Sequence, residues 1–238
     1  MRVLNLRWGP THIIIAANII VYIVTSVAGG NFIETEFSPT YIYLAQFNAF
    51  IHSYGWQKVN VLTSTSAFTV SVPCPALWQL FTSMFVHANI MHIFGNMFFL
   101  LIFGYRAEVL FRSREYYFIY FASGLFGNVL SLFLMPDYTI VTVPGGRVYY
   151  ELTSSVGASG AIFGVFGASV IFIRRAVGQS IIGALMYAFF LFMMNVGPGV
   201  NVFAHLGGLI AGLLIGYWLA KRRMRIVHTY SYSFSVNH

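Results

Sequence analysis

Six stretches of the chain are almost wholly apolar, and each is close to the roughly 17–25 residues that a helix needs to cross a bilayer. They are His12–Val27, His92–Ala107, Tyr116–Met135, Gly157–Ile173, Gln179–Val196 and Phe203–Ala220. Of the 238 residues, 58% are hydrophobic and only 8% are charged, whereas a soluble domain carries about 25% charged residues. The pattern excludes a soluble domain and predicts an all-α membrane protein, a bundle of six transmembrane helices.

The basic residues gather in alternate gaps between these stretches. They are Arg2, Arg7, Arg106, Arg112, Arg114, Arg174, Arg175, Lys221, Arg222, Arg223 and Arg225, while Lys58 and Arg147 fall in other gaps. Because cytoplasmic loops are enriched in Lys and Arg, this alternation predicts that both termini are cytoplasmic. The predicted organisation is a membrane domain over residues 1–225, in a prokaryotic plasma (inner) membrane, and a loose cytoplasmic tail over residues 226–238.

The same placement of charge indicates the partners. A net charge of +7 could suggest nucleic acid, but the basic residues lie where a helix would meet a membrane surface, so we expect a lipid bilayer and no nucleic acid. The first apolar stretch could resemble a signal peptide. Its removal would leave five crossings and put the basic clusters on the wrong sides, so we interpret it as a helix.

Two connections on the predicted outer side are long. The first runs from Gly29 to about Cys74 and is rich in aromatic residues, and the second runs from Pro136 to Ser155. Loops beyond about 12–15 residues are usually functional or disordered. We expect the first to pack against protein or to lie at the membrane interface. Since Cys74 is the only cysteine, no internal disulfide can form.

Polar side chains recur near the outer ends of the second, fourth and sixth stretches. They are His87, His92, Asn96, Ser159 and His205. Polar groups inside a membrane are costly and are usually functional. Each also has a plain structural interpretation, since a serine often bonds to its own helix and a histidine often bonds to a neighbouring one. The sequence therefore offers these five side chains as candidates.

Small residues suggest how two of the candidates could meet. Glycines at spacings of four line one face of the fourth stretch and one face of the sixth: Gly160, Gly164, Gly208, Gly212 and Gly216. Such faces usually mean close helix packing. That packing would bring the Ser159 hydroxyl within hydrogen-bond reach of the His205 ring. A serine beside a neutral imidazole is an activated nucleophile.

Hydrolysis also needs donors aimed at the developing oxyanion. His92 and Asn96 are four residues apart and so share one helix face. The backbone N–H of Ser159 is a third candidate. None of the six acidic residues lies at the outer end of an apolar stretch, so a Ser–His dyad is the simplest arrangement. The chain has no H-E-x-x-H zinc motif and no pair of aspartates in these stretches, and we expect neither metal nor cofactor.

Three short motifs together resemble the rhomboid intramembrane serine proteases: GASG at 157–160, AHLGG at 204–208 and HIFGN at 92–96. The resemblance covers the chain from about Trp78 to Ala220. It implies the six-helix fold, Ser159 as nucleophile, His205 as base and oxyanion donors at His92 and Asn96. It also implies a supporting role for His87.

The chain departs from the family pattern at two positions. Gln79 follows Trp78 where the family often has arginine, and Phe163 stands where a tyrosine often stacks under the base histidine. Stacking survives the second change, and neither change removes a catalytic group.

The resulting hypothesis is a serine endopeptidase that cleaves single-spanning membrane protein substrates near the outer membrane face. The resemblance implies a small residue before the cut and a helix-destabilising segment nearby. A transporter or channel whose polar helix ends line a solute pathway is an alternative from another class. A rhomboid relative that binds membrane clients without cleaving them is a third.

Overall fold

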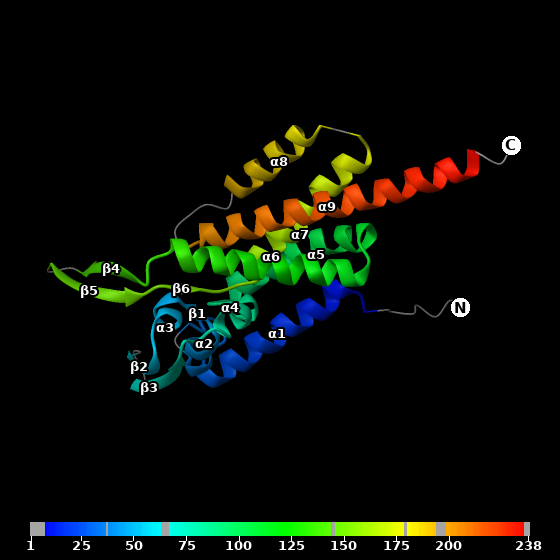
Figure 1. The fold of residues 1–238 in the computed structure, drawn as a ribbon. Helices are drawn as coiled ribbons and strands as arrows, with labels where there is room; N and C mark the ends of the chain where they lie inside the picture. The colour runs from blue at the N-terminus through cyan, green and yellow to red at the C-terminus, as the bar shows by residue number, and fades with distance from the viewer. Residues whose placement is uncertain are drawn as a thin grey trace, which may run out of the picture.

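The computed structural model describes residues 8–36, 38–62, 67–143, 146–178, 180–193 and 199–235. Its longer helices form one bundle, with short helices and strands gathered at one end (Figure 1). The longer helices are α1 (Pro10–Gly29), α5 (Ile90–Leu110), α6 (Ser113–Leu134), α7 (Ser159–Ala176), α8 (Ile181–Met193) and α9 (Val202–Ser235). The chain is thus mostly helical, as predicted.

Five of the described helices are long and apolar enough to cross a membrane: α1, α5, α6, α7 and the part of α9 that spans Val202–Arg223. They coincide with five of the six predicted stretches. The remaining stretch contains α8, which has 13 residues. Residues 179 and 194–198, on either side of it, lie outside the described residues. The bundle is confirmed, and the count of six crossings stays a prediction.

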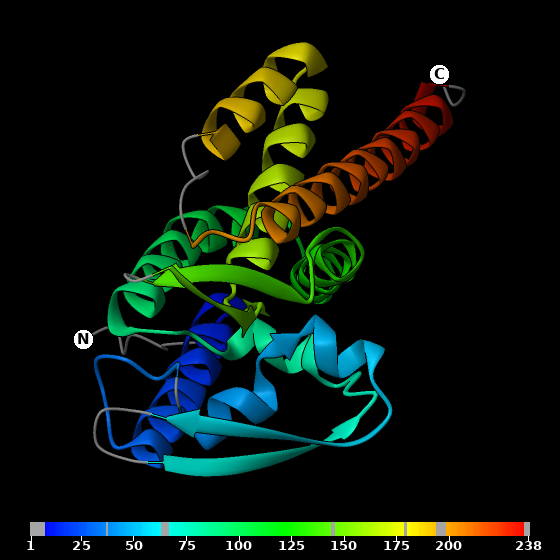
Figure 2. The same ribbon diagram turned by 90° about the vertical axis from the view of Figure 1, so that its left-hand side faces the viewer.

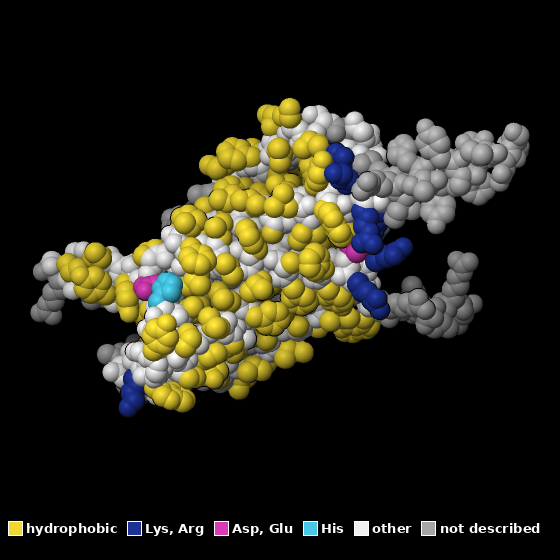
Figure 3. Space-filling model, viewed as in Figure 1, with side chains coloured by type: hydrophobic (Ala, Val, Ile, Leu, Met, Phe, Trp, Pro, Cys, Tyr) yellow, Lys and Arg dark blue, Asp and Glu magenta, His cyan; other side chains and the backbone are white. Residues whose placement is uncertain are grey.

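Most of the described Lys and Arg side chains gather at one end of the bundle (Figure 3), whereas Lys58 and Arg147 belong to the strands of the two loops. α1 begins and α9 ends at this end (Figure 1), while apolar side chains cover the flank of the molecule in Figure 3. Polar contacts also tie the helices here. A Glu108 carboxylate oxygen on α5 accepts a hydrogen bond from the Thr11 backbone N–H of α1 at 2.7 Å, and Arg223 on α9 pairs with Glu115 on α6 at 2.6 Å.

Helix α7 lies at the centre of the bundle and packs against α5, α6 and α9. Its contact with α9 depends on missing side chains, because a Cβ at Gly208 would overlap the backbone of Gly160 and one at Gly212 would overlap the backbone of Gly164. Two small-residue faces thus allow the backbones to touch, as the spacing of four predicted. The first turns of α7 and α9 are brought side by side.

Two long loops lie at the end of the bundle away from the basic cluster. The first loop, between α1 and α5, contains α2 (Pro39–Leu44), β1 (Gln46–Phe47), α3 (Asn48–His52), β2 (Gly55–Leu62), β3 (Ala67–Cys74), α4 (Gln79–Thr82) and the 3-10 helix η1 (Ser83–Phe85). The second loop, between α6 and α7, contains β4 (Tyr138–Val143), β5 (Arg147–Leu152) and β6 (Ser154–Ser155).

The strands of these loops form three two-stranded antiparallel sheets, β1–β6, β2–β3 and β4–β5. The all-α prediction is therefore right for the bundle and wrong for the loops. In the first loop the sequence did carry a signal for strands, an alternation of valines. Val61, Val70 and Val72 are buried on the inner face of β2–β3. Alternating β-branched residues favour strands, but the sequence analysis treated these segments only as connections.

The first loop is folded rather than open. Buried side chains from its helices and strands form a hydrophobic cluster that includes Tyr41, Phe47, Phe50, Val72 and Val86. In Figure 2 this layer lies beside α1. The expectation that the loop packs against protein is confirmed.

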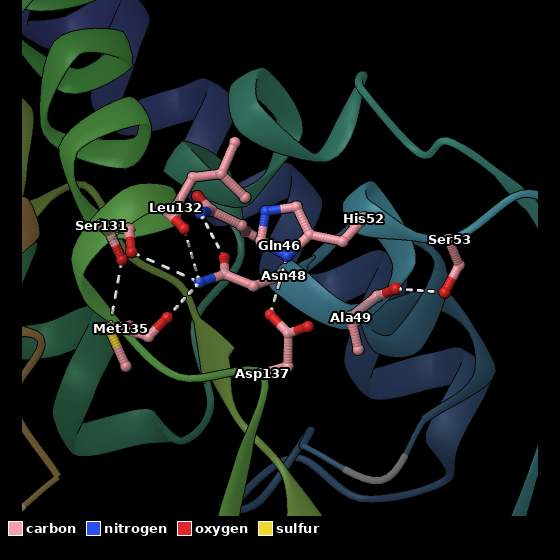
Figure 4. A network of polar contacts seen from close by, with 9 residues as sticks. All are labelled: Gln46, Asn48, Ala49, His52, Ser53, Ser131, Leu132, Met135 and Asp137. Atoms are coloured by element: carbon pink, nitrogen blue, oxygen red, sulfur yellow. Dashed lines mark hydrogen bonds and ion pairs between the residues drawn. The ribbon is translucent and has the colours of Figure 1, made fainter.

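Polar contacts fasten the first loop to the last turn of α6 (Figure 4). The Asn48 side-chain amide donates to the backbone carbonyls of Ser131, Leu132 and Met135, at 3.3, 3.4 and 3.1 Å. The Ser131 carbonyl also accepts the Met135 backbone N–H at 2.8 Å. Carbonyls at a helix end lack a partner within the helix, so Asn48 supplies a donor to those of Leu132 and Met135. Nearby, the His52 ring lies 2.9 Å from the Asp137 carboxylate. The loop is thereby held in place over the end of the bundle.

The chain after residue 225 differs from its predicted irregular conformation. Helix α9 continues without a break to Ser235, so most of the segment 226–238 is helical. The last apolar helix nucleates this extension, because adding a residue to an existing helix requires no new nucleus. The division into a membrane domain and a cytoplasmic tail stays a prediction.

Candidate active site

Ser159 is the first residue of α7 and is partly buried. The chain reaches it from β6 through Gly157, whose φ of 113° is strained for residues that carry a Cβ. The Gly157 backbone N–H donates to the Ser83 carbonyl oxygen at 2.9 Å. This glycine lets the chain turn sharply from the loop into the helix.

His205 lies in the first turn of α9 and is only 9% exposed. The distance between its Nε2 atom and the Ser159 Oγ atom is 2.6 Å. Its Nδ1 atom is buried and has no hydrogen-bond partner among the described residues. The two side chains that the sequence predicted to meet are in hydrogen-bond contact, without a carboxylate bonded to the far side of the ring.

His92 and Asn96 lie in the first two turns of α5, beside the turn that carries Gly157. A Cβ atom at Gly157 would lie 2.8 Å from the His92 Nε2 atom and 3.8 Å from the Asn96 Nδ2 atom. The Asn96 side chain is 7% exposed, and its amide donates to the His92 carbonyl oxygen at 2.9 Å. Both side chains therefore point from α5 toward the segment that leads into Ser159.

His87 precedes α5 and is fully buried. Its Nδ1 atom lies 3.3 Å from the Phe85 carbonyl oxygen, and its ring packs edge-on against that of His92 with centroids 5.1 Å apart. Burial, reinforced by the neighbouring His92, lowers the pKa of the His87 imidazole to about 3. A neutral, enclosed ring of this kind supports the position of His92.

One cavity of about 850 Å³ is lined by four of the five candidates, Ser159, His205, His92 and Asn96, whereas His87 is not part of its lining. Its walls come from α5, α6, α7, the start of α9 and both loops. Among the described residues that line it, Glu36 is the only one with a charged carboxylate, ammonium or guanidinium side chain. Partial burial, then the carboxylates of Glu151 and Glu34, raise the pKa of Glu36 above its usual value. In the described part of the chain, the cavity included, no three His, Cys, Asp or Glu residues gather in a way that could hold a metal ion.

The Rhomboid domain family model matches residues 75–222, more than half of the chain. The chain belongs to the rhomboid family. With its apolar helices, this membership makes it a multi-pass integral membrane protein of a family that includes proteins named as proteases.

Three relatives illustrate the rhomboid similarity. RHOMBOID-like protein 6, mitochondrial, of Arabidopsis thaliana is 34% identical over 148 residues, 60% of this chain and 43% of that protein. YdcA of Bacillus subtilis (strain 168), whose name marks it provisionally as a rhomboid protease, is 29% identical over 167 residues, 68% of this chain and 77% of that protein. Rhomboid-like protease 3 of Toxoplasma gondii is 29% identical over 147 residues, 58% of this chain and 50% of that protein. The match thus covers less than half of the Arabidopsis relative.

The two departures from the rhomboid pattern have structural explanations. Gln79 is fully buried; its Oε1 accepts from the Phe47 backbone N–H at 3.0 Å, and its Nε2 donates to the carbonyls of Ile42 and Tyr43 at 3.2 and 3.3 Å. It therefore fastens the first loop through neutral hydrogen bonds. The Phe163 ring lies 4.8 Å from that of His205, tilted by 32°, so an aromatic platform remains beneath the histidine.

Other residues that line the rhomboid cavity were missed from the sequence, among them Glu36, Asn128 and Asn201. The Asn128 side chain joins α6 to the Leu80 carbonyl and the Ser83 hydroxyl, at 2.8 and 3.0 Å. Asn201 directly precedes α9, and an asparagine just before an apolar periodic stretch is a helix-start signal. That signal could have singled out Asn201, whereas nothing in the sequence places the loop residue Glu36 at the cavity.

Proposed function

We propose that this rhomboid is an intramembrane serine endopeptidase that works through a Ser159–His205 dyad. The observation that carries the proposal is the 2.6 Å contact between Ser159 Oγ and His205 Nε2 within the cavity. A serine is a weak nucleophile until a base accepts its proton. A neutral imidazole at this distance is within the range that general-base transfer requires.

The reaction then takes two stages. His205 Nε2 accepts the hydroxyl proton as Ser159 Oγ attacks the scissile carbonyl carbon, and the imidazolium returns that proton to the departing amine nitrogen. An acyl-enzyme remains. A water molecule, deprotonated by His205, attacks the ester, and the proton passes back to Ser159 Oγ as the carboxylic acid product leaves. Each stage passes through an oxyanion, which fixed hydrogen-bond donors stabilise.

We assign the oxyanion donors to His92 and Asn96, with the Ser159 backbone N–H as a third. The position of both side chains beside Gly157 supports this assignment. One N–H of the Asn96 amide is used by the His92 carbonyl, which leaves its second N–H for a substrate oxygen. Phe163 fixes the plane of the His205 ring from below.

We further propose six crossings with both termini on the cytoplasmic side, α8 lying within the fifth. The gathering of basic residues where α1 begins and α7 ends supports this orientation. The cavity is then nearer the outer face, and the substrates are single-spanning membrane proteins. A prokaryotic plasma membrane also stays a prediction.

The test uses the purified full chain in proteoliposomes with a single-spanning test substrate and a fluorophosphonate probe. We expect cleavage, and labelling at Ser159 that is lost in Ser159→Ala. Ser169→Ala is the matched control, since this buried serine bonds to the Val165 carbonyl of its own helix at 2.8 Å. A wild-type protein that is folded but neither cleaves nor reacts with the probe would contradict the proposal and favour a client-binding role.

A further inference from the structure

Asn201 connects three segments through one side chain. Its Nδ2 atom donates to the Ser155 hydroxyl of β6 at 2.6 Å and to the Ser131 hydroxyl of α6 at 2.7 Å. Its Oδ1 atom accepts from the Ala204 backbone N–H in the first turn of α9, at 3.0 Å. An amide has two N–H donors, so both are used, and every polar atom of the side chain has a partner.

These contacts are close to both members of the proposed dyad. Ser155 precedes Ser159 by four residues, and Asn201 precedes His205 by four. The Asn201 carbonyl oxygen also accepts the His205 backbone N–H at 3.2 Å. One residue therefore holds the backbone of the base and the strand that leads to the nucleophile.

The partners of Asn201 are fixed. Ser155 and Ser131 are 5% and 0% exposed. Ser155 is further held because Gln46 of β1 is its partner in the β1–β6 pair. Because these two hydroxyls are held in place, the hydrogen bonds to them fix the position of the Asn201 side chain.

The packing of α7 against α9 does not by itself fix where one helix lies along the length of the other. Close backbone contact at Gly160, Gly164, Gly208 and Gly212 sets how near the helices approach. Faces of small residues interdigitate little, so they hold the helices less firmly against sliding along their length. The directional bonds at the helix ends limit that sliding.

We propose that Asn201 is a positioning residue that sets the register of α9 against β6 and thereby keeps His205 Nε2 at bonding distance from Ser159 Oγ. The proposal rests on the proposed protease function. The hydrogen bonds of Asn201 go to Ser131, Ser155, Ala204 and the His205 backbone rather than to either reacting atom, so its effect passes through the backbone. A misplacement of about 1 Å can lower a rate by about 10²-fold.

The test begins with three single variants; a double variant and Asn201→Asp complete it. Asn201→Ser keeps a good helix cap but is too short to reach both hydroxyls, and Ser155→Ala removes only the β6 acceptor. Ser131→Ala, the matched control, removes only the α6 acceptor. We measure kcat and KM on a single-spanning substrate, the fluorophosphonate reaction rate and the melting temperature.

For Asn201→Ser and Ser155→Ala we expect kcat and the labelling rate to fall roughly 10-fold or more, with KM within about twofold. The double variant Asn201→Ser with Ser155→Ala should be no slower than the slower of its two single variants, because both changes break the same hydrogen bond between Asn201 and Ser155. Asn201→Asp, which keeps the shape and can accept from both hydroxyls, should recover most of the rate. Ser131→Ala should lower the melting temperature and leave kcat unchanged.

An unchanged labelling rate in folded Asn201→Ser would overturn the proposal, and so would losses that multiply in the double variant. If Asn201→Ser does not fold, Ser155→Ala alone decides, since an unchanged rate there refutes the connection. A wild-type protein that does not react with the probe would instead refute the protease function, so the two failures are distinguishable.

Discussion

Replacing Gly157 by alanine perturbs the candidate site through a single added methyl group. A Cβ at this position would lie 2.8 Å from His92 Nε2 and 3.0 Å from His92 Cε1, whereas ordinary contact begins at 3.4 Å. The imidazole must therefore move by about 0.6 Å or the turn must open. The φ of 113° adds backbone strain, of about 1–3 kcal/mol.

From these distances we expect Gly157→Ala to lower kcat on the order of 10-fold, since a full 1 Å misplacement costs about 10²-fold. The matched control is Gly55→Ala, where φ is 74° and nothing lies within 4 Å of the added atom. Both variants should lose stability through strain, but only Gly157→Ala should lose activity per folded molecule. We would measure kcat and melting temperature on the same preparations. Equal kcat values for the two variants would refute the reasoning.

Three further predictions follow from other contacts. Asn96→Ala should lower kcat by up to about 10²–10³-fold, the range for one oxyanion donor; an unchanged kcat in a folded variant would remove Asn96 from the site. Asn48→Ala should lower the free energy of unfolding by about 0.5–1.5 kcal/mol, the net contribution of a typical hydrogen bond, because the partly buried carbonyls of Leu132 and Met135 lose their donor; chemical denaturation measures this, and an unchanged free energy would show that Asn48 does not cap α6. Glu36→Gln should raise the melting temperature at pH 7 and leave it unchanged well below pH 4.5, because a raised pKa in the folded state means that stability falls as pH rises through it. The opposite pH dependence would show that the Glu36 carboxylate is stabilised by its surroundings.

Much of the bundle could be predicted from the sequence because a membrane imposes strong local rules. A crossing needs a long apolar stretch, and α1, α6 and α7 appear within a few residues of their predicted bounds. Glycines every fourth residue on two stretches likewise predicted the close approach of α7 and α9.

Contacts set by the loops could not be predicted in this way. The β2–β3 and β4–β5 pairs are local hairpins. The β1–β6 pair instead joins Gln46 to Ser155, which are far apart in the chain. Neither apolar length nor charge placement reports such pairing. Glu36 was missed for the same reason, because the fold of the first loop is what places it at the cavity.

The candidate site was accessible to a sequence argument only in part. Ser159 and His205 stand out because polar groups are rare in apolar stretches. Asn201 lies just before its stretch and so escaped that criterion, although it contacts β6, α6 and α9. Helix caps are ordinary features of sequence, and only the structure shows that this one reaches two other segments.

The most direct test of the central claim is a double-mutant cycle on Ser159 and His205. The unmutated protein is compared with Ser159→Ala, His205→Ala and the double variant for kcat on one single-spanning substrate, at equal folded concentration. If the two residues act as one unit, each single variant loses nearly all activity and the double variant is little worse than either. Losses that multiply, or substantial turnover by folded Ser159→Ala, would contradict the account.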